Sequence, residues 1–78
     1  MSEMQIEAML ASPPERDEVV VQLFAKGGGQ WGEIYRDSNE YWIDLYCSDS
    51  SPLRFKVDAL VTALSHSQKE LRDRLGPS

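Results

Sequence analysis

Few side chains in this 78-residue chain are of the types that carry out catalysis. Cys47 and His66 are the usual candidates for a nucleophile and a general base, and neither has the partner that such chemistry requires. We expect Cys47 to be an inert thiol on the apolar side of a strand and His66 to be a surface residue of a helix. No pair of histidine or cysteine residues has the spacing of a metal site. The sequence therefore predicts no enzymatic activity, no metal, no cofactor and no small-molecule substrate.

Two carboxylates form a second chemical feature. Glu33 and Asp44 fall directly opposite each other when the two central predicted strands are paired antiparallel. Like charges in that position destabilise a sheet unless a cation lies beside them, and Arg54 or Lys56 on the next strand can supply it. A carboxylate pair can also perform acid and base chemistry, but no substrate pocket accompanies this one. We interpret it as part of a surface charge cluster.

Aromatic residues are the third feature, because four of the seven rings lie between residues 31 and 42. Strand alternation places most of the rings on one side of the predicted sheet, which we call the aromatic face. Tryptophan, tyrosine and arginine are the residue types enriched where protein interfaces concentrate their binding energy. The predicted partner-binding residues are Phe24, Trp31, Tyr35, Trp42, Tyr46, Arg54 and Lys56.

The elements that position these residues are predicted from the spacing of the apolar side chains. Residues 1 to 14 predict a short N-terminal helix or arm, because Ile6, Met9 and Leu10 recur at spacings of three and four and two prolines follow. Residues 18 to 58 then predict a meander of four antiparallel strands. Their approximate ranges are 18–25, 30–36, 41–47 and 52–58.

The register of the meander follows from this alternation. Ile34 opposes Ile43 and Tyr35 opposes Trp42, whether the loop between the strands has two or four residues. The side of the sheet opposite the aromatic face is then aliphatic. This aliphatic face consists of Val19, Val21, Leu23, Ile34, Ile43, Leu45, Leu53, Phe55 and Val57.

A C-terminal helix is predicted for residues 59 to 75, with Asp58 as its N-cap. Its apolar residues, which we call the helix stripe, are Leu60, Val61, Leu64, Leu71 and Leu75. We expect the helix stripe to pack on the aliphatic face, since each is the apolar side of its element. The predicted architecture is a single α+β domain, residues 1 to 78, in the order αββββα.

Charge and composition limit the classes of partner. Thirteen acidic and eight basic residues give a net charge of −5, which repels polyanions such as duplex DNA at long range. A single cysteine cannot form an internal disulfide, and no apolar run has the length of a signal-peptide core or a membrane span. We expect a cytoplasmic protein without membrane contact.

The aromatic face is too large to stay bare in a monomer, so something should cover it. The cover could be the N-terminal segment, a partner protein or second copy of the chain, or a flat ligand that stacks on the rings. The main expectation is a non-enzymatic protein-interaction module that self-associates or binds a partner through this face. The alternative is a domain that binds single-stranded nucleic acid through the same rings. In outline, the order of four strands and a helix between residues 18 and 75 resembles the repeats of PUR-type nucleic-acid-binding proteins.

Overall fold

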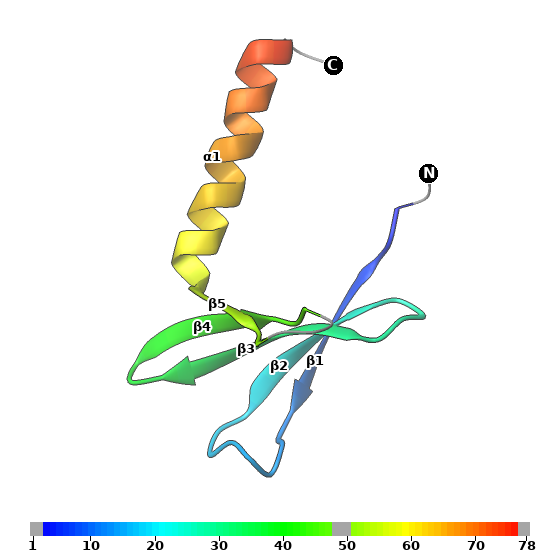
Figure 1. Ribbon diagram of the computed structural model, residues 1–78, viewed down its shortest axis with the longest axis vertical. Coiled ribbons are helices and arrows are strands. Elements are labelled where there is room, and N and C mark those ends of the chain that lie inside the picture. Colours follow the sequence, from blue (N-terminus) through cyan, green and yellow to red (C-terminus); the bar gives the residue numbers. More distant parts are fainter. Residues whose placement is uncertain (1–2, 48–50, 77–78) are drawn as a thin grey trace.

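The computed structural model describes residues 3 to 47 and 51 to 76. Its elements are β1 (Ile6–Ala11), β2 (Val20–Ala25), β3 (Gln30–Asp37), β4 (Glu40–Leu45), β5 (Leu53–Lys56) and α1 (Val57–Leu75). The strands form one antiparallel sheet in chain order, so that β1 and β5 are its edges (Figure 1). Within the described ranges the fold is α+β, as predicted, with five strands and one C-terminal helix in place of four strands and two helices.

Residues 6 to 11 form a strand, so the predicted N-terminal helix is wrong. β1 pairs with β2 along its whole length, starting with Ile6 opposite Ala25. Helix propensities differ by less than about 1 kcal/mol per residue, and backbone pairing with a neighbouring strand outweighs them here. The first two residues of the predicted helix lie outside the described ranges.

The register predicted for the two central strands is confirmed. Ile34 lies opposite Ile43 and the remaining pairs of β3 and β4 follow in step. The connecting loop has two residues, Ser38 and Asn39, with φ angles of 54° and 65°. Positive φ at both positions is the type I′ turn, whose twist matches that of the flanking strands. The turn therefore decides between the two loop lengths that the sequence allowed.

The pairing of β2 with β3 keeps the alternation predicted for the meander only as far as Leu23. Leu23 lies opposite Gly32, but Phe24 lies opposite Gln30, so Trp31 is an extra residue at a register shift. Gly32 fits this crowded place, because a Cβ atom there would lie 3.1 Å from the backbone oxygen of Asp44, a tighter contact than side chains usually make. The shift separates Trp31 from the regular alternation that the sequence predicted.

Helix α1 does not pack on the sheet, and the prediction that it covers the aliphatic face is wrong. It begins at Val57, directly after the last residue of β5, so Asp58 lies in the first turn and not at the N-cap. Figure 1 shows the helix rising away from the sheet. None of its 19 residues, all of which the structure describes, is buried. Only Val57 and Leu60, in its first turn, are half-buried.

The hydrophobic core is correspondingly small. The buried apolar residues in the described part of the chain are Val20, Leu23, Tyr35 and Ile43. The accessible surface is 6688 Å², whereas a compact monomer of 8.8 kDa exposes about 4,800 Å². The radius of gyration is 15.1 Å against about 11.5 Å expected for 78 residues. As a single chain the molecule therefore leaves about 1,900 Å² more surface exposed than a compact domain of its size.

Candidate interaction surface

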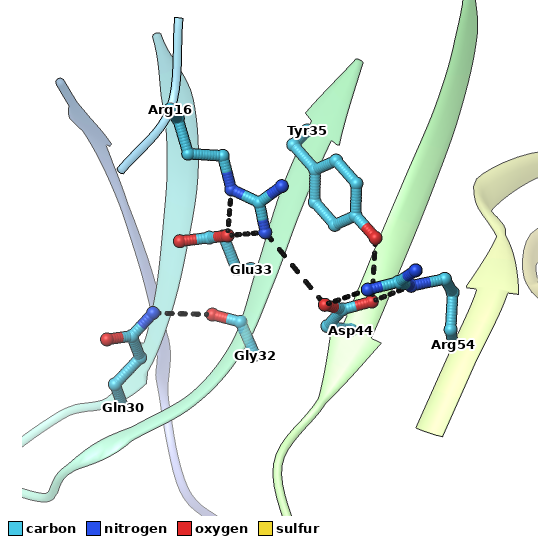
Figure 2. Close-up of polar contacts among 7 residues, drawn as sticks. All are labelled: Arg16, Gln30, Gly32, Glu33, Tyr35, Asp44 and Arg54. Carbon is cyan, nitrogen blue, oxygen red and sulfur yellow. Dashed lines mark hydrogen bonds and ion pairs between the residues drawn. The ribbon is translucent and has the colours of Figure 1, made fainter. Parts of the chain in front are cut away.

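A network of charged residues occupies the centre of the aromatic face (Figure 2). Arg16 reaches it from the connection between β1 and β2, where its backbone N–H donates a hydrogen bond of 3.1 Å to the carbonyl of Pro13. The Arg16 side chain donates from Nε to Oε1 of Glu33 at 2.9 Å, and its Nη2 lies 2.6 Å from the same oxygen. Its guanidinium carbon lies 3.8 Å from the centre of the Tyr35 ring, a cation–π contact. Arg16 thus covers part of the aromatic face.

Asp44 is the second anion of this network and is 4% exposed. It accepts a hydrogen bond of 2.9 Å from the hydroxyl of Tyr35. Arg54 donates to both of its carboxylate oxygens, at 3.0 Å from Nε and 3.4 Å from Nη2. Nη2 of Arg16 lies 3.9 Å from Oδ2. The prediction that Glu33 and Asp44 face each other beside a cation is confirmed, with Arg54 from β5 and Arg16 as the cations.

Burial and pairing act in opposite directions on the ionisation of Asp44. Burial alone would raise the pKa of Asp44, but hydrogen bonds from Arg54 and Tyr35, together with the arginine charges, lower the pKa below its ordinary value. The pKa of Tyr35 is raised, first by burial and then by its hydrogen bond to the Asp44 carboxylate. Asp44 is therefore held ionised and Tyr35 neutral. Carboxylates that are already bound by arginines are poorly suited to moving protons.

The structure brings four of the predicted contact residues together around this network. Tyr35 and Trp42 are paired across β3 and β4, and Arg54 and Lys56 follow on β5. The Nζ of Lys56 lies 5.8 Å from the Trp42 ring, as the register predicted, and 3.1 Å from a carboxylate oxygen of Glu40. Tyr35 is 5% exposed, so little of its ring is open to a partner.

Of the other three predicted contact residues, Tyr46 adjoins the network, since the charges of Glu33, Asp44 and Arg16 act on its hydroxyl. Phe24 and Trp31 are half-buried, and Tyr46 is 41% exposed. Trp31 lines a shallow apolar hollow with Ile6 and Ala25 at the end of the β1–β2 hairpin. Its ring therefore borders a different part of the surface from that of Tyr35.

The exposed apolar residues lie mainly on the other side of the sheet. Those within the strands are Ile6, Met9, Leu10, Tyr41, Leu53 and Phe55. By register all of them except Met9 share the aliphatic face, which β1 extends with alternate residues from Ile6 to Leu10. Most of the helix stripe is also bare, with Leu64 at 62% and Leu75 at 79% exposure. We call the exposed residues of the aliphatic face and the helix stripe together the open apolar surface.

Sequence reasoning missed Arg16, Ile6 and Leu10 as residues of these surfaces. Arg16 lies in an irregular connection, and no periodicity places a loop residue over a sheet. The strand β1 does have a signal, because Ile6, Ala8 and Leu10 alternate with period two. That signal was ambiguous, since Met9 also fits a helical spacing.

Other kinds of site have little support in the described residues. No group of three or more histidine, cysteine, aspartate or glutamate side chains there is arranged to hold a metal ion. Cys47 is exposed, which corrects the expectation of a packed thiol. No described helix is long and apolar enough to cross a membrane. Comparisons with protein-family models, curated proteins and solved structures find no match to this chain.

Proposed function

We propose that the chain is a non-enzymatic protein-interaction module whose contact surface is the open apolar surface. The observation that carries this proposal is the excess of about 1,900 Å² in an accessible surface of 6688 Å². Exposed apolar patches larger than a few hundred Å² usually mark protein contacts in soluble proteins. The exposed side chains of the open apolar surface, among them Leu10, Phe55 and Leu64, contribute to this excess, and a partner that covers them removes them from water.

The isolated helix supports the same proposal. Helices in proteins gain most of their stability from packing an apolar side, and none of the 19 residues of α1 is buried within its own chain. Leu64 and Leu71 lie in the middle of the helix stripe and are 62% and 59% exposed. A partner on the helix stripe supplies the packing that the sheet of the same chain does not.

The aromatic face is, in this proposal, mainly a structural layer. Tyr35 is already covered by Arg16, and both buried carboxylates are paired with arginines. A partner on this face, as predicted from the sequence, would be left with the rim formed by Trp42, Tyr46 and Lys56. More of the exposed apolar residues of the strands lie on the opposite side, so we place the contact there.

Site-specific photocrosslinking tests the proposal in cells that express the full chain. A photoreactive phenylalanine derivative replaces Leu64 in the helix stripe or, as a matched control, His66 on the opposite side of the same helix. We expect a defined protein adduct from position 64 and none from position 66. Adducts in equal yield from both positions, or from neither, would contradict the proposal.

The nucleic-acid alternative gives a different result in a separate titration. Trp42 lies on the aromatic face beside Lys56. If single-stranded nucleic acid stacked there, mixed oligonucleotides at low salt would quench the tryptophan fluorescence, and added salt would reverse the quenching. Our proposal predicts no salt-dependent quenching.

A further inference from the structure

We infer that the partner is a second copy of the chain, and that α1 of each copy packs on the aliphatic face of the other. This inference rests on the function proposed above and names the partner of the same surface. It follows from three features of the structure: the junction between β5 and α1, the size of the exposed areas, and the chemistry of the two surfaces.

The junction prevents α1 from covering its own sheet. A helix that folds back on the preceding strand usually follows a loop of about two to six residues. Here β5 ends at Lys56 and α1 begins at Val57, with no residue between them. Lys56 has an extended backbone, with φ −67° and ψ 138°, so the helix continues outward from the sheet edge (Figure 1). The helix stripe beyond the first turn can be covered only by another molecule.

The dimensions of the two surfaces fit each other. The 19 residues of α1 span about 28 Å at 1.5 Å per residue. Five strands spaced about 4.8 Å apart give a sheet about 19 Å across, and the eight residues of β3 extend about 26 Å. One helix therefore covers the aliphatic face of one sheet without a large overhang.

The area is also that of a stable dimer. If each copy buries the excess of about 1,900 Å², the interface covers about 3,800 Å² in total, within the range of about 2,000 to 5,000 Å² seen for obligate homodimers. Such interfaces are more apolar than transient ones, and the large apolar side chains Leu53, Phe55 and Leu64 are exposed on this surface. A surface of this size and character favours a permanent partner.

A two-fold exchange of helices covers both surfaces at once. Each copy offers one helix stripe and one aliphatic face, so a single symmetry operation satisfies both and leaves no open end for further copies. The helix carries three acidic and three basic residues and is neutral, so its approach to an acidic sheet meets no net repulsion. The contact between the helix stripe and the aliphatic face, which the sequence predicts within one chain, is thereby made between two chains.

Photocrosslinking with isotope labels tests the inference in purified protein. Full-length chains with the photoreactive residue at position 64 are mixed in equal amounts, one half labelled with ¹⁵N, and are equilibrated before irradiation. After trypsin cleavage, residue 64 lies in the peptide that ends at Lys69, apart from the peptides of the strands. We expect crosslinks of mixed isotope composition between that peptide and strand peptides that carry the aliphatic face.

Each other outcome overturns the inference in a recognisable way. Crosslinks that join two helix peptides indicate a dimer paired through its helices. If every crosslink joins peptides with the same isotope label, the helix is folded on the sheet of its own chain. A single foreign protein crosslinked to position 64 in cells, together with a monomer in purified samples, would remove the second copy but leave the proposed function standing. An absence of adducts in both settings would remove both.

Discussion

Lys56, the last residue of β5, is followed directly by Val57, the first residue of α1. The direct join explains why a helix stripe and an aliphatic face of matching character do not meet within one chain. If the missing loop is what keeps the helix away from its own sheet, then adding a loop should allow the helix to fold back.

We expect an insertion of four glycine and serine residues between Lys56 and Val57 to produce a monomer. The longer connection lets the helix stripe cover the aliphatic face of its own chain. This contact within one chain competes with the contact between two chains, and it does not lose the translational and rotational entropy that association costs. Sedimentation velocity should show the dimer dissociation constant raised at least about tenfold, which corresponds to about 1.4 kcal/mol. The same four residues inserted between Gly28 and Gly29 serve as the control and should leave association unchanged. An unchanged dimer after the first insertion would contradict the account.

Shortening a leucine of the helix stripe should weaken association. Leu64 is 62% exposed in the single chain, so Leu64→Ala would be nearly neutral or slightly helix-stabilising if the helix had no partner. In the exchanged dimer two such leucines are buried, and truncating each costs about 2 kcal/mol or more. We expect the dissociation constant to rise at least about tenfold in a dilution series followed by sedimentation. His66→Ala, on the opposite side of the helix, should have no effect, and equal results for the two variants would refute the prediction.

Removing the hydroxyl of Tyr35 should destabilise the sheet. Tyr35→Phe deletes the donor to Asp44 and leaves part of a buried carboxylate without its hydrogen bond, which costs about 1 to 2 kcal/mol. Urea unfolding followed by tryptophan fluorescence measures this loss, at one fixed protein concentration because the stability of a dimer depends on concentration. Tyr41→Phe is the matched control, since Tyr41 is 59% exposed, and should change stability by less than about 0.5 kcal/mol. Equal losses in the two variants would show that the Tyr35 hydroxyl has no special role.

The charge network should make stability fall in acid. Because the pKa of Asp44 is lowered in the folded state, folding favours the ionised carboxylate. This contribution is fully present above the ordinary aspartate pKa of about 4 and is lost as the pH falls below it through the lowered value. We expect the unfolding free energy to drop more steeply between about pH 4 and 2 in the native chain than in Asp44→Asn. Asp73→Asn, on the outer side of α1, should keep the native slope, and a native slope in Asp44→Asn would rule out this contribution.

The central strands could be predicted from the sequence because their information is local. Ile34 and Ile43 alternate with polar or aromatic neighbours on either side of a turn-forming pair, Ser38 and Asn39, so period and turn agree on one register. The positions of Arg54 and Lys56 beside Asp44 and Trp42 followed from the same alternation.

The edges of the fold depend on longer-range contacts and were predicted less well. Residues 6 to 11 carry both a helical and a strand pattern, and only the presence of β2 alongside decides between them. Arg16 lies in an irregular connection, so nothing local places it over Tyr35. The position of α1 also had a signal in the sequence, because no glycine, proline or serine that could form a loop lies between Lys56 and Leu60. The match between the helix stripe and the aliphatic face was given more weight than this signal.

The mass of the purified chain in solution shows whether two copies associate. Sedimentation equilibrium over about 1 to 100 μM should give twice the 8.8 kDa of one chain at the upper concentrations, as expected for an interface of obligate size. The same mass should persist in Cys47→Ser, which excludes a disulfide between the exposed thiols of two copies. A mass of 8.8 kDa throughout this range would contradict the exchanged dimer.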